Sequence, residues 1–207
     1  MAAITTYSDL QATIASYLAR SDLTAMIPTF IQLAETRLRR ELRLRQMLKS
    51  VTITATAGDS TIAMPSDFLQ IRDLHVVTNP VATLEYQSPS ALFRNSRTTD
   101  SGLPRQYTVL ADEFQLSPVP DSNYTLNLLY YFQPVFLSSS VASNEFMAIC
   151  PDLLLYGSLG EAEPYLMNDS RLATWAQMYD RGVSALTVSD DQGEYGGSPL
   201  SITTALR

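Results

Sequence analysis

Hydrophobic residues recur at helical spacing near both ends of the chain and alternate with polar residues in its middle. Apolar positions three and four residues apart lie on one face of an α-helix. This spacing predicts helices over residues 6–19, 28–47, 151–167 and 170–185. Between residues 50 and 133 the apolar positions alternate instead, as in Val51, Ile53 and Ala55. Such alternation is typical of strands with one buried face.

This order of segments predicts an α+β protein. A helical bundle, built from two N-terminal and two C-terminal helices, would carry an inserted antiparallel β module at residues 50–133. We expect residues 1–185 to form a single domain, with about a third to two-fifths of the chain in helices. Residues 186–207 are rich in Ser, Gly, Asp and Thr and lack a helical period. They predict a flexible or extended C-terminal tail.

The second helix combines an apolar stripe with a basic side. Residues 28–49 hold six of the fourteen basic residues of the chain. The stripe is formed by Ile27, Ile31, Ala34, Leu38 and Leu42. The basic side comprises Arg37, Arg39, Arg40, Arg43 and Arg45. Two interpretations stay open: a face that only meets water, or a surface that binds an acidic partner or nucleic acid.

The charges of the chain are divided unevenly along its length. Residues 1–105 carry a balance of +2 and residues 106–207 a balance of −9, which together give the net charge of −7. A basic rod and an acidic remainder favour contact between identical copies. A net acidic chain is a poor general binder of nucleic acid, because phosphate contacts require a concentrated basic surface.

Signals for catalysis and for cofactors are weak. His75 is the only histidine and lies in an apolar, strand-like run, and Cys150 is the only cysteine. One cysteine excludes an intrachain disulfide and a cysteine-based zinc site. No G-x-G-x-x-G, P-loop or H-E-x-x-H pattern occurs. We therefore predict a protein that is not an enzyme and needs no cofactor.

The chain also lacks signals for a membrane. No apolar run approaches the roughly 18–20 residues that span a bilayer. The first residues lack the basic and apolar regions of a signal peptide. We expect a protein made in a reducing cytoplasm.

Several short segments, taken in order, resemble a known family. They are Tyr7-Ser8-Asp9-Leu10, Asp22-Leu23-Thr24, Ala34-Glu35-Thr36-Arg37-Leu38-Arg39-Arg40-Glu41-Leu42-Arg43, Met64-Pro65-Ser66-Asp67-Phe68, Leu84-Glu85-Tyr86, Gly102-Leu103-Pro104, Leu116-Ser117-Pro118-Val119-Pro120, Tyr124-Thr125-Leu126, Cys150-Pro151-Asp152-Leu153-Leu154-Leu155-Tyr156-Gly157-Ser158-Leu159, Pro164-Tyr165-Leu166 and Trp175. Each alone is also ordinary capping, turn or core chemistry. Their order and spacing resemble the head-to-tail adaptors, also called portal adaptors or head-completion proteins, of short-tailed bacteriophages.

The resemblance implies a structural role in the neck of a virion. Similar proteins form a ring, usually of about twelve copies, beneath the portal. The expected partners are further copies of the chain, the portal protein, and tail, nozzle or fibre proteins. DNA would pass through the channel without sequence-specific binding, and no membrane would be involved. In related adaptors a C-terminal tail orders on contact with the portal. This implies an interface at Gly193, Tyr195, Leu200 and Ile202, besides the five arginines named above.

Two alternatives to the adaptor remain. The chain could be another neck or tail component, such as a stopper or a tube terminator. It could also be a DNA-packaging accessory that uses the arginine helix.

Overall fold

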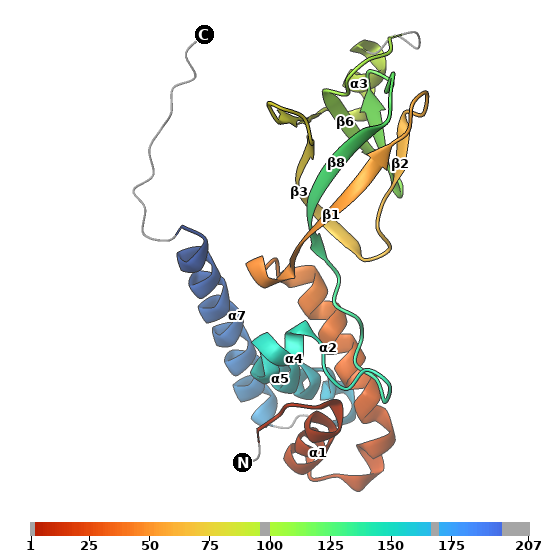
Figure 1. Ribbon diagram of the computed structural model, residues 1–207. Helices are drawn as coiled ribbons and strands as arrows, with labels where there is room; N and C mark the ends of the chain where they lie inside the picture. Colours follow the sequence, from red (N-terminus) through yellow and green to blue (C-terminus); the bar gives the residue numbers. More distant parts are fainter. Residues whose placement is uncertain (1–2, 96–99, 167–169, 196–207) are drawn as a thin grey trace. The chain divides into compact units, whose positions relative to one another are not determined.

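The computed structural model describes residues 3–95, 100–166 and 170–195 (Figure 1). Its contacts divide the chain into two compact units. Residues 1–46 and 134–207 form one, the helical unit, and residues 47–133 form the other, the β unit. The α+β class is confirmed, with 47% helix and 24% strand. The helical share exceeds the expected two-fifths because the last helix is longer than its sequence period suggested.

The helical unit begins with α1 (Tyr7–Leu18), the short 3-10 helix η1 (Ser21–Met26) and α2 (Ile27–Glu41). Thr6 caps α1: its hydroxyl accepts from the amide of Asp9 at 3.2 Å, and the Asp9 carboxylate accepts from the amide of Thr6 at 3.0 Å. This reciprocal pair is a capping box, which satisfies two amides that the helix itself leaves without a partner. The predicted first helix is thus present with nearly its predicted bounds.

The second helix ends earlier than predicted. We expected it to reach residue 47, but α2 ends at Glu41 and Leu42 is extended, with φ −100° and ψ 138°. Leu42 and Leu44 are both buried. Two residues apart on a helix they would point to nearly opposite sides, whereas an irregular, extended segment can bury both. A 3-10 turn, η2 (Arg45–Met47), follows.

The predicted helix over residues 151–167 is divided in two. α5 (Pro151–Glu161) ends at Glu161, Ala162 is its C-cap, and α6 (Glu163–Leu166) follows. Pro164 explains the break, since it has no amide to continue the ladder of α5 and is tolerated in the first turn of a new helix. A further short helix, α4 (Glu145–Ile149), precedes α5 and was not predicted. Asn144 caps it by accepting from the amide of Met147 at 3.1 Å.

The last helix continues into the segment predicted as a tail. α7 spans Arg171–Tyr195, so the prediction of a flexible tail from residue 186 is wrong for residues 186–195. Residues 196–207 of that prediction lie outside the described residues. The helical period was missed because few of the later α7 residues face the core. Polar contacts, described below, hold this end of the helix in place of an apolar stripe.

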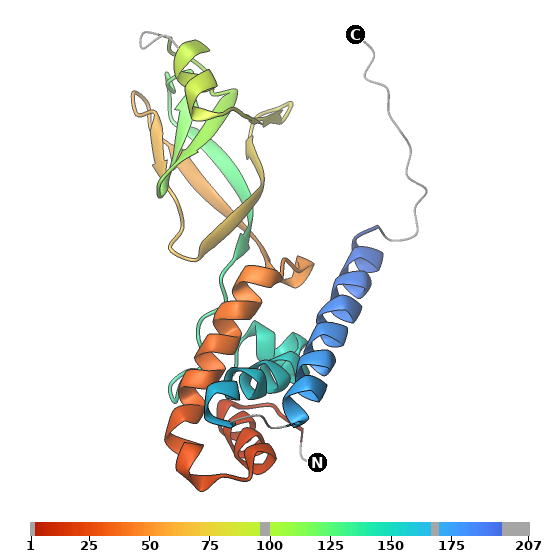
Figure 2. The same cartoon turned by 180° about the vertical axis from the view of Figure 1, so that it is seen from behind.

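Helix α5 forms the centre of the helical unit and is buried from two sides. In the opposite views of Figures 1 and 2 it lies between α2 and α7. Two glycines allow this close packing. A Cβ built on Gly157 would lie 3.2 Å from Ala34 and from the ring of Tyr179, and one on Gly182 would lie 2.6 Å from Leu153. Larger residues there would require the neighbouring side chains to shift, which disturbs the packing between the helices.

The β unit consists of two four-stranded sheets. One has the order β1 (Leu48–Ala55), β8 (Tyr124–Phe132), β3 (Phe68–Val76) and β4 (Ala82–Thr83), with all neighbours antiparallel. The other has the order β2 (Thr61–Ala63), β7 (Glu113–Ser117), β6 (Gln106–Leu110) and β5 (Glu85–Tyr86). Its β5–β6 pair is parallel, unlike the antiparallel arrangement expected throughout. A short helix, α3 (Pro89–Asn95), follows β5.

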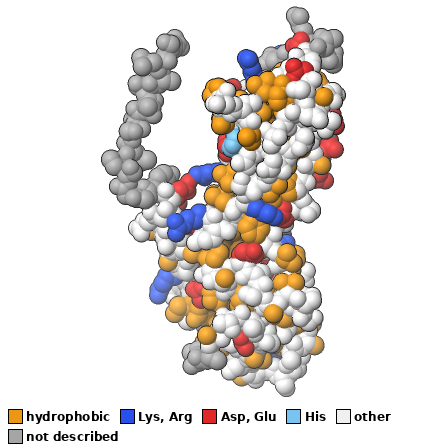
Figure 3. Space-filling view, in the orientation of Figure 1, with side chains coloured by type: hydrophobic (Ala, Val, Ile, Leu, Met, Phe, Trp, Pro, Cys, Tyr) orange, Lys and Arg blue, Asp and Glu red, His pale blue; other side chains and the backbone are white. Residues whose placement is uncertain are grey.

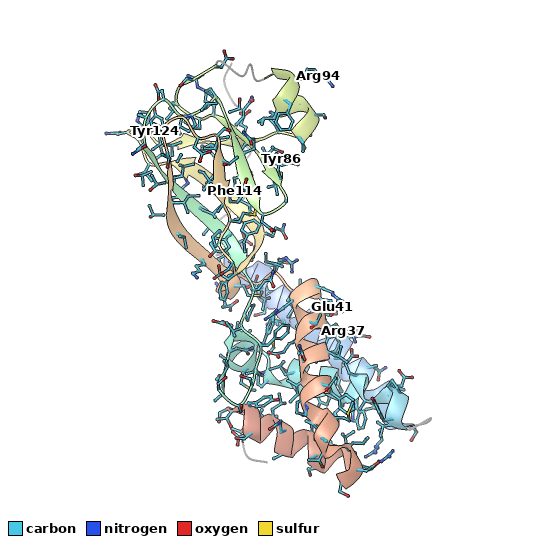
Figure 4. All side chains as sticks on the ribbon, turned by 90° about the vertical axis from the view of Figure 1, so that its right-hand side faces the viewer. Arg37, Glu41, Tyr86, Arg94, Phe114 and Tyr124 are labelled. Carbon is cyan, nitrogen blue, oxygen red and sulfur yellow. The ribbon has the colours of Figure 1, made fainter. Side chains whose placement is uncertain are left out.

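Aromatic rings hold the core of the β unit together. Phe114 is fully buried, and its ring centroid lies 5.6 Å from that of Phe68 and 6.1 Å from that of Tyr107. Figure 4 shows Phe114 among the strands, whereas Tyr86 and Arg94 lie near α3. Edge-on contacts of this kind add to the gain from burying the ring surface.

We predict that Phe114→Ala lowers the free energy of unfolding of the β unit by about 3–5 kcal/mol, because it removes a buried ring and leaves a cavity. Phe93, on α3 and 58% exposed, provides the matched control. Phe93→Ala should change the free energy by less than about 0.5 kcal/mol. Urea unfolding followed by circular dichroism measures both, and equal effects would show that Phe114 is not a core residue.

Candidate interaction surface of the helical unit

The candidate arginines come mainly from α2 and the segment that follows it, and each has a different environment. Arg37 forms a salt bridge with Glu41 one turn later, at 2.8 Å, and Figure 4 shows both side chains on α2. The Arg37 guanidinium also lies over the ring of Tyr179 in α7, 4.1 Å from its centroid. Asp180 lies 3.9 Å away. Arg37 thus joins α2 to α7 within one chain.

Glu41 and Tyr179 complete this connection. The Tyr179 hydroxyl donates to the Glu41 carboxylate at 2.7 Å. Burial, together with this bond, raises the pKa of Tyr179 well above its usual range. Burial acts to raise the pKa of Glu41, but the hydrogen bonds from Arg37 and Tyr179 outweigh it and lower this pKa. The three side chains form one network that keeps α7 in contact with α2.

Arg39 is held inside the unit. Its guanidinium lies over the ring of Phe136, 3.4 Å from the centroid, and donates to the carbonyl oxygen of Pro134. Its Nε is buried and has no hydrogen-bond partner within the described part of the chain. Burial lowers the pKa of Arg39, against the opposing charge of Glu35. Arg39 therefore supports the chain where it re-enters the helical unit and is not the free surface cation that the sequence suggested.

Glu35 binds the same segment, residues 134–144, through which the chain returns to the helical unit. The residue is only 1% exposed, although its side chain ends in an ionisable carboxyl group. Its carboxylate accepts from the amide of Leu137 at 3.1 Å and from the side-chain amide of Asn144 at 2.7 Å. Asn144 donates from the same nitrogen to the carbonyl of Val135 at 2.8 Å. Burial raises the pKa of Glu35, partly offset by these hydrogen bonds and by Arg39.

Arg43 and Arg40 differ sharply. Arg43 donates to the carbonyl oxygens of Arg39 at 2.9 Å and of Leu42 at 2.7 Å, so it caps the end of α2. Arg40 is exposed, and no ion pair or hydrogen bond of its side chain is found within the described residues. Among the five predicted arginines, Arg40 comes nearest to the expected solvent-facing cation.

Arg45 fastens the end of α7. Its backbone amide donates to the Asp190 carboxylate at 3.1 Å, and its guanidinium lies 3.7 Å from the same carboxylate. The guanidinium also donates to the carbonyl of Gly193 at 3.1 Å. A Cβ on Gly193 would lie 2.6 Å from the guanidinium carbon, so a larger residue there would require the end of the Arg45 side chain to move. Two predicted interface residues, Arg45 and Gly193, therefore contact each other within one chain.

Three predicted site residues remain, Tyr195, Leu200 and Ile202. The backbone of Tyr195 ends α7. Leu200 and Ile202 lie outside the described residues. The sequence reasoning missed Glu35, Tyr179 and Asp190, which organise the surface. The signal for Glu35 was available, since it falls one turn after Ile31 and one turn before Leu38 and so lies beside the apolar stripe.

The environments of His75 and Cys150, the two residues considered for catalysis, favour structural roles. His75 lies in β3, and its Nδ1 is 2.7 Å from the carboxylate of Asp73. Cys150 is buried, and burial raises the pKa of its thiol to about 12. A thiol with so high a pKa is protonated at neutral pH and is a poor nucleophile. Within the described ranges, no group of three or more His, Cys, Asp or Glu side chains is arranged to hold a metal ion.

The surface of the helical unit contains exposed apolar residues and a groove. Leu33 on α2 is 45% exposed, and Met178 and Val188 on α7 are also exposed. A groove of about 810 Å³ runs between α1, α2 and the segment after Phe136. Hydroxyl, amide and apolar side chains line it, including the rings of Tyr7 and Phe136, and none of the lining residues is charged. Figure 3 shows basic and acidic side chains together along α7 on the face in view.

We predict that Glu35→Ala lowers the free energy of unfolding by about 1–3 kcal/mol, because the amides of Leu137 and Asn144 lose a buried acceptor. Glu35→Gln should cost less, since it keeps one acceptor oxygen. The pKa of Glu35 is raised in the folded state. Protonated Glu35 therefore contributes its full stability below the unfolded pKa, and this contribution is lost as the pH rises through the folded pKa. Glu35→Gln should therefore cost less at pH 7 than at pH 4 in thermal or urea unfolding. A larger cost at pH 7 would contradict the raised pKa.

We also predict that Arg45→Ala loosens only the end of α7. Amide hydrogen exchange should become faster at residues 187–194, which Arg45 holds through Asp190 and Gly193. Exchange near Trp175 and Tyr179 should stay unchanged, because their rings are buried. Arg40→Ala is the matched control and should alter neither region. Faster exchange along the whole helix would mean that Arg45 supports the unit more broadly.

Comparison with known proteins identifies the family of the chain. Within the described residues, no helix combines the length and the apolar character that spanning a bilayer requires. The search of curated proteins gave no match. The family model described as SU10 adaptor protein matches residues 5–203, which is nearly the whole chain and includes both units. The protein thus belongs to the SU10 adaptor protein family, a family of bacteriophage structural adaptors.

Proposed function

We propose that this protein is a virion protein that assembles into a ring between the portal and the tail and extends the channel through which DNA leaves the head. The observation that carries the proposal is the family match over residues 5–203. The role is structural, and the expected partners are further copies of the chain, the portal and tail, nozzle or fibre proteins.

The arrangement of the helical unit supports an assembling protein. Its flanking helices α2 and α7 are fixed to each other by the network of Arg37, Glu41 and Tyr179. They leave apolar side chains such as Leu33 and Val188 on the outside. A rigid helical body with exposed apolar positions is suited to contacts between proteins, because little order is lost on binding.

The alternative of a DNA-packaging accessory receives less support. That role would require the arginines of α2 to form a concentrated basic surface. Instead, Arg37 is paired with Glu41, Arg39 is partly buried on Phe136, and Arg43 binds backbone carbonyls. These contacts within the chain leave few guanidinium groups of α2 available to bind phosphate groups. Another neck component, such as a stopper or tube terminator, remains the second candidate.

The proposal is tested by mixing the purified protein with the portal protein of the same phage. Electron microscopy should show rings of this protein attached to the portal, absent from either protein alone at the same concentration. Analytical ultracentrifugation gives the mass of the complex and so the number of copies. A complex without rings, or no complex over a wide range of protein and salt concentrations, would refute the proposed role. Binding to a tail tube but not to the portal would favour a tube terminator.

A further inference from the structure

Two helices of the helical unit carry a stripe of side chains that no other described element covers, all of them exposed except Thr36, which is half-buried. The outer α2 stripe consists of Thr29, Leu33, Thr36 and Arg40. The outer α7 stripe consists of Thr174, Met178, Arg181, Ala185, Val188 and Gln192. In each stripe the residues follow one another at steps of three and four, so they lie along one face of their helix. Such a face can accept a neighbouring helix.

The two stripes belong to the outer helices on opposite flanks of the unit. Figures 1 and 2 show α5 between α2 and α7, so each of these helices covers one side of α5. The inner faces of both helices are buried against α5, as Ala34 and Tyr179 are at Gly157. A protein with two different contact faces on opposite flanks can bind the next copy head to tail. Repetition of such a contact closes a ring when the rotation per copy permits.

The two stripes carry one arginine each, Arg40 and Arg181, and no acidic residue, so the charge complementarity comes from the residues around them. From Ile27 to Arg45 the chain carries five arginines and two glutamates, whereas α7 carries four acidic residues and two arginines. Arg40, at the end of the outer α2 stripe, and Asp191, beside the outer α7 stripe, form no ion pair within the described residues. Leu33 and Val188 supply exposed apolar surface on the two sides. Opposite charges around apolar positions give both attraction and orientation.

We propose that the outer α7 stripe of one copy packs against the outer α2 stripe of the next copy, and that this contact builds the ring. The inference rests on the proposed function and names the surfaces that carry it. Leu33 is buried against Ala185 and Val188 of the neighbour, and Arg40 lies near the acidic end of the neighbouring α7. A symmetric contact of two α7 stripes is disfavoured, because it would bring the Arg181 side chains of both copies together.

Cysteine cross-linking tests the contact directly. Cys150 is 2% exposed, so it will react little with a maleimide and gives a low background. Leu33→Cys and Val188→Cys are made as separate variants, assembled together on the portal, and treated with a short bismaleimide. We expect a cross-linked dimer when the two variants are mixed and none when either is assembled alone. Val81→Cys, at an exposed position of the β unit, replaces Val188→Cys in the control mixture and should give no dimer.

A charge variant gives an independent readout. Val188 is 55% exposed and Val81 is 60% exposed, so glutamate can replace either without entering a core. Val188→Glu should reduce the number of rings on the portal by roughly tenfold or more, because a charge would be buried at every interface. Val81→Glu should assemble like the parent. Circular dichroism confirms that both variants are folded.

The outcomes separate this inference from the proposed function. Two results together would overturn the interface and leave the proposed ring function standing. In these, Val188→Glu forms rings like the parent, and the mixture of Leu33→Cys and Val188→Cys gives no cross-linked dimer. Cross-links within a single variant would assign a symmetric contact instead. Failure of the parent protein to form rings with the portal would overturn the proposed function and this interface together.

Discussion

The burial of α5 between two other helices is the constraint on which the helical unit depends. Leu153, Leu154, Leu155 and Leu159 supply apolar surface on more than one side of α5, and all four are buried. α2 and α7 must therefore both cover it, although they come from opposite ends of the chain. Gly157 and Gly182 make this possible by removing the Cβ atoms at the closest approaches. The outer faces of α2 and α7 are then displayed on the surface as a consequence of that central packing.

A second constraint concerns charged groups in apolar surroundings. Glu35 and Arg39 are drawn into the unit because they bind the segment from Pro134 to Asn144, where the chain returns from the β unit to the helices. A buried carboxylate is tolerated only with such donors around it. This use of charge explains why part of the basic side of α2 faces inward. The sequence shows that the arginines share a helix, but the loop that receives Arg39 lies far away along the chain.

Periodic apolar positions made much of the fold predictable, and the failures have local causes. The α+β class, the first helix and the inserted sheets follow from periods of 3.6 and 2 residues. The end of α2 was missed because the burial of Leu44 depends on tertiary packing. The end of α7 was missed because Arg45 and Asp190 hold it by a contact between distant positions. The candidate site was only partly predictable for the same reason: Arg37 and Arg45 were named, but Glu41, Tyr179 and Asp190 were not identified as their partners.

The insertion of the β unit into the helical unit has a consequence for synthesis on the ribosome. The strands from Leu48 to Phe132 are contiguous in the sequence, so the β unit can complete its core as soon as these residues emerge. The helical unit cannot, since α2 must wait for α5 and α7 from the last third of the chain. For several seconds, at typical elongation rates of about 5–20 residues per second, the apolar stripe of α2 remains uncovered. The newly made chain thus passes through a stage in which one unit is folded and the other needs protection from aggregation.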